Sequence, residues 1–443
     1  MTDVANMQKN MEKGLFKFLR KASEYLIYLF VFLLPWQTKL ILQPGSNNYS
    51  EISLYASQIL LLLILLLFLF QSTREKECIG DCRRVLYALL SFVFFVFIST
   101  FFATDKFLAF YRSFIILSGV CLFFIIRFGT MQQNYQEPLL NRSYLVFSFL
   151  SGVFLQAILG IYQFLTQSTP VCKYLGLAAH NSTDLGAAVV ETAAGRWLRA
   201  YGGLDHPNIL GGLLAVSLII AVCILAKKKM LNSRRQVWAS IFLFIFYFVT
   251  LYALFFTFSR SAWLALLFGF LVLLIVFVVN KDKWILGRFL ALLLFSSLLI
   301  FMAVIPFQDL VTTRIKADTR LEQKSIIERT SSIAEANKIL QQHSLTGVGA
   351  GNYTLALASL DDNKKPAWDY QPVHNSFLLS LAENGVFAFS AFLIFIFFLL
   401  KNKKREAFAL PVIAALFILM MLDHWLLSLP FGVFFLFLIL GLI

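Results

Sequence analysis

Long apolar runs recur through this 443-residue chain and limit what it can fold into. Hydrophobic residues make up 59% of the chain, and charged residues make up only 14%. The runs are long enough to cross a bilayer as helices. They lack the alternation over about ten residues that is typical of transmembrane barrel strands. The sequence therefore predicts an all-α integral membrane protein.

We predict about twelve transmembrane helices from the positions of these runs. They are expected at residues 25–42, 53–70, 85–103, 107–126, 144–166, 207–226, 237–257, 262–280, 288–306, 376–400, 407–421 and 427–443. Residues 1–24 are interpreted as a cytosolic amphipathic lead-in rather than a cleaved signal, because the long run that follows has no small-residue cleavage site. Residues 25–306 then hold spans one to nine, and residues 376–443 hold spans ten to twelve.

The net charge of +14 raises the alternative of nucleic-acid binding. The lysines and arginines argue against that alternative, because they cluster in short segments between apolar runs, such as KNKKRE at 401–406. This distribution is how orientation is set in a bacterial inner membrane. It predicts a multi-pass protein with both termini in the cytoplasm.

Two long segments are expected on the outer, periplasmic face, at 167–206 and at 307–375. All five histidines fall on that face in this topology: His180, His206, His343, His374 and His424. The second segment contains an amphipathic helical pattern, in which one stripe carries Ile326, Ile333, Ala336 and Leu340. Arg329 falls inside this apolar stripe, so we expect it to point at the protein body or into a cavity. The glycines of TGVGAGNY, which follows, predict a tight turn with close backbone approach.

The cysteines do not form a disulfide framework. Cys121 and Cys223 fall in predicted spans, and Cys172 lies alone outside. Cys78 and Cys82 share one predicted cytosolic loop but lack further ligands for a zinc site.

Three residues are candidates for catalytic roles. His374 opens the stretch VHNSFLLSLAENG, and a neutral imidazole there can accept a proton as a general base. A helix-start histidine that only bonds backbone groups is the alternative. Arg260, in FTFSRSAW, and Arg329 can each hold a phosphate with a permanently charged guanidinium. Their alternatives are a snorkelling arginine for Arg260 and a salt bridge to Glu322 or Glu328 for Arg329.

Four further residues are candidates for substrate binding. They are Arg196 and Arg199 in GRWLRAYG, His206, and Asn375, which is expected to orient the His374 imidazole. Loop surface charge is the alternative for the two arginines, and helix capping before Pro207 is the alternative for His206. Asp423-His424-Trp425 is interpreted as an interfacial turn. No acidic cluster predicts a metal site, so phosphate neutralisation is expected from arginines.

Taken in order, the stretches RAYGGLDHPNILGG, TFSRSAWLAL, IIERTSSIAEANKILQQHSLTGVGAGNY and VHNSFLLSLAENG resemble the O-antigen ligase and polymerase superfamily. The resemblance covers about residues 195 to 400. It implies a GT-C-like membrane fold and a metal-independent, inverting glycosyltransferase without a cofactor. The donor would be a glycan on undecaprenyl pyrophosphate, and the acceptor a lipid A-core sugar or another lipid-anchored sugar. Arg260 and Arg329 would hold the pyrophosphate, and His374 would activate or orient the acceptor hydroxyl.

The acceptor remains open between ligase and polymerase. His374, Asn375 and Gly385 fit the ligase signature, but Ala388 stands where that signature has Gly, Thr or Tyr. The polymerase spacing is met by Arg196 and Gly212. An anion transporter is the alternative from another class. It is disfavoured because charges near the bilayer midplane mark transport sites, and the predicted spans are nearly free of them.

Overall fold

Two helices, α6 (Pro207–Lys227) and α16 (Pro430–Leu442), form the centre of the protein. Almost every side chain of both is buried. Their sequences are apolar on all sides, which is the pattern of a helix enclosed by other helices. Helix α16 packs against α4 (Lys106–Gly129), and α6 packs against α7 (Arg234–Phe256) and α8 (Arg260–Val279).

The computed structural model describes residues 2–47, 49–72, 83–131, 138–227, 233–361, 365–401 and 407–443. Its other α-helices are α1 (Thr2–Leu33), α2 (Ala56–Ser72), α3 (Arg83–Ser99), α5 (Arg142–Thr166), α9 (Lys283–Val304), α10 (Gln308–Lys316), α11 (Arg320–His343), α12 (Tyr353–Ser359), α13 (Ser376–Lys401), α14 (Ala409–Leu422) and α15 (Trp425–Ser428). Short 3₁₀ turns cover Thr100–Phe102, Lys173–Leu175, Ile305–Phe307 and Ala367–Asp369. Two antiparallel hairpins pair β1 (Lys39–Gln43) with β2 (Ile52–Tyr55) and β3 (Val189–Thr192) with β4 (Gly195–Leu198).

The described helices confirm the all-α membrane class. Eight segments are long and apolar enough to cross a membrane, and shorter apolar helices lie at Ala56–Phe68, Ala409–Leu422 and Pro430–Leu442. The last two are shorter than the predicted spans eleven and twelve. A helix of 13 residues, such as α16, is about 20 Å long, less than the roughly 30 Å of hydrocarbon. It is tolerated because α16 is enclosed by protein rather than by lipid.

The first predicted span, 25–42, is wrong at its end. Helix α1 stops at Leu33, two residues before Pro35, and the chain then enters strand β1. Proline does not continue a helix, because it lacks an N–H group and clashes with the preceding turn. The apolar residues Leu40, Ile41 and Leu42 belong to the exposed strand β1 and not to a helix.

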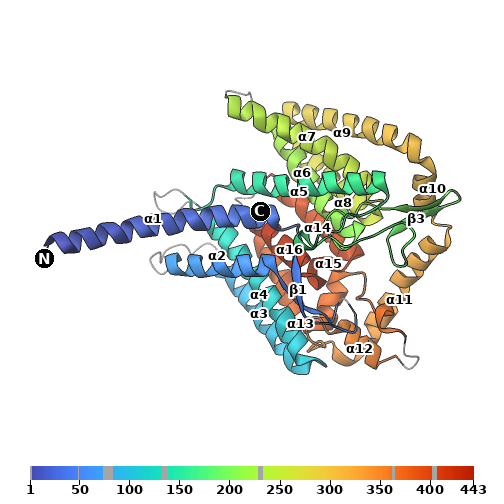
Figure 1. Ribbon diagram of the computed structural model, residues 1–443, viewed down its shortest axis with the longest axis horizontal. Helices are drawn as coiled ribbons and strands as arrows, with labels where there is room; N and C mark the ends of the chain where they lie inside the picture. The colour runs from blue at the N-terminus through green and yellow to red at the C-terminus, as the bar shows by residue number, and fades with distance from the viewer. Residues whose placement is uncertain are drawn as a thin grey trace.

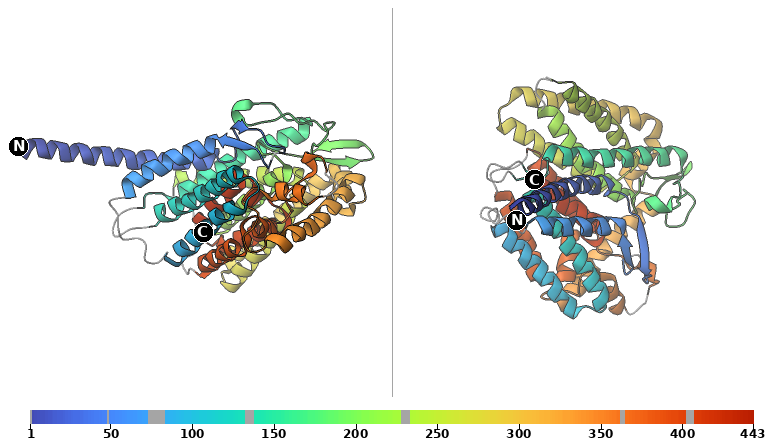
Figure 2. Two further views of the ribbon diagram at one scale, coloured as in Figure 1. Left: turned by 90° about the horizontal axis from the view of Figure 1, so that it is seen from below. Right: turned by 60° about the vertical axis from the view of Figure 1, so that its left-hand side comes forward.

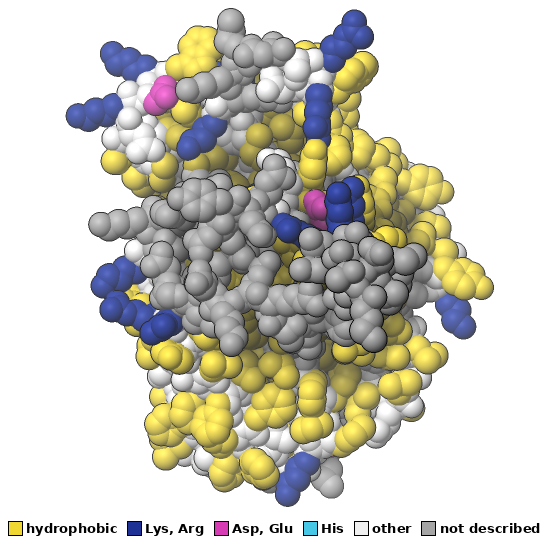
Figure 3. Space-filling model, turned by 90° about the vertical axis from the view of Figure 1, so that its left-hand side faces the viewer, with side chains coloured by type: hydrophobic (Ala, Val, Ile, Leu, Met, Phe, Trp, Pro, Cys, Tyr) yellow, Lys and Arg dark blue, Asp and Glu magenta, His cyan; other side chains and the backbone are white. Residues whose placement is uncertain are grey.

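The second hairpin and two helices outside the bundle lie at one end of the molecule. Figure 1 shows β3, α10 and α11 at the end away from the N-terminus. Figure 2 shows the N-terminal part of α1 projecting from the opposite end. Figure 3 looks at that opposite end, where the visible charged side chains are mostly lysine and arginine among hydrophobic ones. The two ends therefore differ in architecture.

The segment between α9 and α13 is folded against the bundle. The glycine-rich turn that follows α11 contacts a break in α13 at Gly385, which has φ 77° and ψ 172°. The Val348 N–H donates to the Ala382 carbonyl (3.0 Å), and the Gly349 N–H donates to the Glu383 carbonyl (2.8 Å). A Cβ on Gly347 would lie 2.2 Å from the Glu383 carbonyl oxygen, so the predicted close approach is present. This turn joins α11 firmly to the first turns of α13.

Candidate active site

A cavity of about 690 Å³ opens at the end where α6, α8 and α13 begin. This is a usual volume for a small-molecule site. Its charged and titratable lining residues are Lys39, Glu51, Arg112, His180, Arg199, Asp205, His206, Arg260, Arg314, Glu322, Lys324, Glu328, Arg329, His374, Asp423 and His424. The long segments that the sequence places on one face thus meet around one polar chamber.

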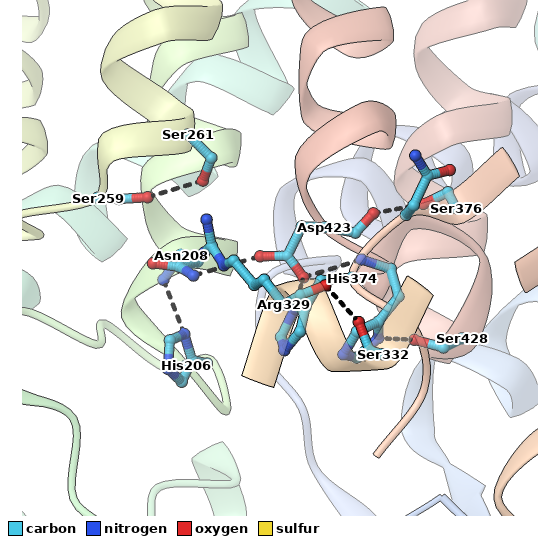
Figure 4. A network of polar contacts seen from close by, with 12 residues as sticks. His206, Asn208, Ser259, Ser261, Arg329, Ser332, His374, Ser376, Asp423 and Ser428 are labelled. Atoms are coloured by element: carbon cyan, nitrogen blue, oxygen red, sulfur yellow. Dashed lines mark hydrogen bonds and ion pairs between the residues drawn. The ribbon is translucent and has the colours of Figure 1, made fainter. Parts of the chain in front are cut away.

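His374 lies at the start of α13 and faces Asp423, which ends α14. The distance from His374 Nδ1 to Asp423 Oδ1 is 3.8 Å, an ion-pair contact rather than a hydrogen bond. Among the described residues, the buried Nδ1 of His374 has no hydrogen-bond partner. With Nδ1 turned to the carboxylate (Figure 4), Nε2 is the ring nitrogen left for a substrate.

Asp423 is fixed from several sides. Its Oδ1 accepts from the His424 N–H (2.8 Å), and its Oδ2 accepts from Asn208 Nδ2 (3.2 Å). Burial opposes ionisation of this carboxyl, but the neighbouring His374 and His424 imidazoles hold its pKa well below its usual range. Asp423 is therefore an anion at neutral pH and can stabilise a positive charge on His374.

Two other histidines of the cavity are neutral at pH 7. Burial, opposed by Asp423, lowers the pKa of His424 to about 4. Burial together with the Arg199 charge lowers the pKa of His206 to about 3. His424 Nδ1 lies 2.7 Å from Ser428 Oγ, and His206 Nδ1 accepts from the Asn208 N–H at 3.1 Å. Both rings thus have fixed hydrogen-bond partners, unlike that of His374.

Asn375 does not orient the His374 ring, which corrects the expectation from the sequence. Its Oδ1 accepts from the Phe377 and Leu378 N–H groups, and its Nδ2 donates to the Met421 carbonyl (3.2 Å). This is the geometry of an N-cap for α13. Asn375 is not among the residues that line the cavity, and Asp423 occupies the place beside the imidazole.

The arginines at one side of the cavity are organised by a buried acid. Glu322 of α11 pairs with Arg260 of α8 at 3.1 Å and also with Arg314 of α10. Arg314 donates in addition to the Phe258 carbonyl through Nε (3.1 Å) and Nη2 (2.7 Å). Arg260, predicted to hold a phosphate, is therefore held next to the cavity by an ion pair.

Arg329 lies seven residues after Glu322 on α11, about two turns further along the helix, and it lines the same cavity. In the part of the chain that the structure describes, its guanidinium makes no hydrogen bond or ion pair, and its buried Nε has no partner. Figure 4 shows the side chain reaching toward Asn208 and Asp423. It is a cation facing the chamber without a protein anion of its own.

The stripe used to predict this orientation is partly wrong. Ile326 and Ile333 are 44% and 48% exposed, whereas Ala336 is fully buried. The buried face of α11 instead runs through Glu322, Ser332, Ala336 and Ile339, and Arg329 lies between its first two members. Arg329 points inward because it shares a face with a buried acid, which apolar periodicity did not reveal.

The remaining predicted residues separate into two groups. Arg199 is buried and donates to the Thr257 carbonyl and to Asn208 Oδ1, both at 2.7 Å. Together with His206 it lines the cavity through the Asn208 network. Arg196 instead donates to the carbonyls of Thr183 (3.2 Å) and Asp184 (3.4 Å) within its own loop. It is not among the cavity-lining residues.

His374, Asp423 and His424 also bring one possible metal ligand each within 4.8 Å of one another. Two imidazoles and a carboxylate can bind a divalent cation. However, His424 Nδ1 and both Asp423 oxygens already have hydrogen-bond partners, so their lone pairs are partly committed. The expectation of a metal-independent site stays a prediction. Cys78 and Cys82 lie outside the described residues, and among the described residues Cys121, Cys172 and Cys223 form no disulfide.

Comparison with known protein families identifies a match within the chain. Residues 245–393 match the O-antigen ligase family. The matched segment includes Arg260, Arg329 and His374, and this confirms the resemblance to the O-antigen ligase superfamily. The family implies an enzyme of the glycosyl-transfer type, a ligase or a polymerase. No curated protein and no solved structure matches the chain significantly.

Several residues of the chamber were missed from the sequence. Asp423 and His424 were interpreted as a turn, and Asn208, Arg314 and Glu322 were not assigned to the site. Asp423 and His424 lie outside the O-antigen ligase match, yet they complete the surroundings of His374. The sequence does contain one sign of this site: Asp423 and His424 stand between two apolar runs, on the face where the other histidines are expected.

Proposed function

We propose that this protein transfers a glycan from undecaprenyl pyrophosphate to a lipid-anchored sugar acceptor, as an O-antigen ligase acting on lipid A-core. The observation that carries the proposal is one chamber that holds a histidine–aspartate pair and Arg329, an arginine with no ion-pair partner among the described residues. The arginine side suits the anionic leaving group, and the histidine side suits a hydroxyl that must lose a proton. The membrane helices α4, α6, α8 and α16 line part of the chamber, which suits substrates that stay in the bilayer.

The donor side is built from Arg329 and Arg260. Arg329 is the stronger candidate because no protein carboxylate competes for it among the described residues. A pyrophosphate there would receive a permanent positive charge at the oxygens that become more negative as the glycosidic bond breaks. Arg260 is shared with Glu322 and is expected to contribute a hydrogen bond on the same side.

The acceptor side is built from His374 and Asp423. The acceptor hydroxyl oxygen attacks the anomeric carbon of the donor, and the bond from that carbon to the pyrophosphate oxygen breaks. Its electron pair leaves with the lipid pyrophosphate, and the hydroxyl proton moves to His374 Nε2. Asp423 stabilises the resulting imidazolium. Attack opposite the leaving group gives inversion, as the resemblance implies.

Placement at the membrane surface supports a periplasmic active face in an inner membrane. The chamber is at the end where even-numbered spans of the predicted topology begin, and the visible opposite end is rich in lysine and arginine. This agrees with the positive-inside pattern.

A polymerase of the same chemistry is the second candidate, favoured by the Arg196 spacing. An anion transporter is less supported, because the cavity-lining charges lie at one end of the bundle.

The test is a deletion strain in which the surface glycan and the lipid-linked pool are analysed together. A ligase predicts full-length polymer stranded on undecaprenyl pyrophosphate, with bare lipid A core. Core capped by a single repeat, without long polymer on either lipid, would identify a polymerase instead. Unchanged glycans in both pools would contradict either enzyme.

A further inference from the structure

The polar chamber has two parts of different chemistry. One part, termed the arginine half, is lined by Arg199, Arg260, Arg314 and Arg329. The other part, termed the tyrosine half, is lined by Lys39, Tyr49, Glu51, Tyr55, Tyr111 and Asp205. These six residues come from the β1–β2 hairpin, from α4 and from the turn before α6. The catalytic roles proposed above use the arginine half and leave the tyrosine half without a ligand.

The tyrosine half adjoins the histidine side of the chamber. The ring of His374 lies 5.3 Å from that of His424, and the ring of His424 lies 5.5 Å from that of Tyr49. Tyr49 in turn interacts electrostatically with Asp205. A hydroxyl held at His374 therefore has the tyrosine half beside it, where the rest of its sugar ring can lie.

The charges of the tyrosine half are nearly balanced. The charged and titratable neighbours of Asp205 are Lys39, Glu51 and His180, and no arginine of the arginine half is among them in the described part of the chain. Lys39 pairs with Glu51 at 2.6 Å. Arg112 also lines the chamber, but its two Nη atoms donate to backbone carbonyls. The tyrosine half therefore lacks the excess of positive charge that suits a phosphate.

Asp205 is a carboxylate without a protein partner. It makes no hydrogen bond or ion pair with the described residues, and its exposed side chain lines the chamber. The turn before it is held by two fully buried glutamines of α5. Gln163 Nε2 donates to the Gly202 carbonyl (2.8 Å), and Gln156 Oε1 accepts from the Gly203 N–H (2.5 Å). The carboxylate is thus presented to the chamber from a fixed backbone.

The tyrosines surround this carboxylate with flat rings and hydroxyl groups. Tyr55 is only 9% exposed, yet its hydroxyl has no hydrogen-bond partner among the described residues, and the same holds for the hydroxyl of Tyr49. The Tyr111 hydroxyl donates to the Ser53 carbonyl at 2.5 Å, which fixes its ring. A tyrosine offers an apolar face and a polar edge. Together with a carboxylate acceptor, such groups match the apolar face and the hydroxyls of a sugar ring.

We propose that the tyrosine half binds the acceptor sugar as an uncharged ring, with Asp205 accepting hydrogen bonds from hydroxyls next to the one that reacts. This inference rests on the proposed function and names the class of substrate on its acceptor side. Arg329 and Asp205, which have opposite charges and no ion-pair partner among the described residues, then sort the two substrates. The pyrophosphate is attracted to one and repelled by the other, so each substrate enters its own half.

The test removes the negative charge of Asp205 and measures each substrate separately. Purified full-length protein receives lipid-linked glycan and bare lipid A-core, and initial rates are measured against the concentration of each. Asp205→Asn is expected to raise KM for the acceptor about tenfold, because a charged hydrogen-bond acceptor is lost. The KM for the donor and kcat should stay near the wild-type values, which also shows that the variant is folded. Glu191→Gln is the matched control, because Glu191 belongs to the same outer segment and does not line the chamber.

The outcomes separate this inference from the proposed function. An unchanged acceptor KM in Asp205→Asn would overturn the inference and leave the proposed function intact. A rise in the donor KM alone would assign the tyrosine half to the donor sugar, and a fall in kcat alone would assign Asp205 to the chemical step; both overturn the inference. A wild type that transfers no glycan would overturn the proposed function and the inference with it.

A charged acceptor tests the substrate class directly. The acceptor is the same lipid A-core with and without a phosphate on its outermost sugar. We expect the wild type to use the phosphorylated form at least about tenfold less efficiently, since the phosphate would face Asp205, and Asp205→Asn should narrow this ratio. Equal or better use of the phosphorylated form by the wild type would overturn the inference.

Discussion

Arg329 is the residue on which the donor site depends most. Its guanidinium faces the chamber, and no described acid pairs with it. Replacement by alanine should reduce transfer by about 100-fold or more, because a preorganised charge on the leaving group is lost. Measurement of initial rates at equal protein abundance checks this. Arg320→Ala is the control, since Arg320 is on the same helix with its side chain 76% exposed. Full activity of Arg329→Ala would remove Arg329 from the mechanism.

Asp423 is a positioning residue that acts through His374. Asp423→Asn keeps the shape but removes the negative charge that stabilises a protonated imidazole. We expect kcat to fall about 100-fold, in the range of general-base contributions, with little change in KM for the donor. Adding Asp423→Asn to His374→Ala should cause no further loss. A further loss in the double variant would show that Asp423 acts independently of the histidine.

The candidate residues show what sequence reasoning recovers at this scale. His374, Arg260 and Arg329 were selected by residue type and local context, and the structure brings all three to one cavity. Asn375 was assigned by its position next to His374, but backbone hydrogen bonds take up its side chain. Asp423 was passed over because its partner is distant in the sequence. A short stretch of sequence does not show which helices and loops contact one another in the fold.

At the scale of elements, the broken helix α13 is the most sensitive part of the site scaffold. Gly385 has a positive φ, and a Cβ there would lie 2.2 Å from the Leu345 carbonyl oxygen. Gly385→Ala should therefore lower the free energy of unfolding by more than the roughly 1–3 kcal/mol of this glycine-only backbone conformation alone. Thermal unfolding in detergent measures this.

A glycine elsewhere provides the matched control. Gly287 of α9 has open space where a Cβ would lie, so Gly287→Ala should be neutral or slightly stabilising. Equal thermal stability of the two variants would contradict the role given to the turn that joins α11 to α13.

Element boundaries were predicted best where the chain is uniformly apolar. Span six was expected at 207–226 and α6 covers Pro207–Lys227, because Pro207 suits the first turn. The first span was extended too far, since exposed strand β1 is as apolar as a membrane helix. Helix α16 is short because the enclosing protein, rather than lipid, sets its length. Hydrophobicity alone does not distinguish a helix in lipid from an exposed apolar strand or from a helix enclosed by protein.

At the scale of the whole molecule, the buried histidines make stability depend on pH. In the unfolded chain a histidine gains its proton near pH 6.5, but His424 does so near 4 and His206 near 3 in the fold. Between pH 6.5 and 4 the unfolded state therefore binds more protons, and stability falls as the pH falls. At pH 5 each histidine costs roughly 2 kcal/mol.

Asp423 adds to this loss only at lower pH, as its own depressed pKa is approached. The apparent melting temperature should therefore be lower at pH 5 than at pH 7. His206→Gln should reduce the difference. A melting temperature that rises on acidification would contradict the neutral state assigned to these rings.

The central claim is that this chamber transfers a lipid-linked glycan through His374 without a metal. The most direct measurement uses purified full-length protein, lipid-linked glycan extracted from the deletion strain, and a lipid-anchored acceptor, in the presence of EDTA. The release of undecaprenyl pyrophosphate is followed over time. We predict release by the wild type at the same rate with and without EDTA, and release at least about 100-fold slower by His374→Ala. Undiminished release by His374→Ala, or release that EDTA abolishes and Mg²⁺ restores, would contradict the account.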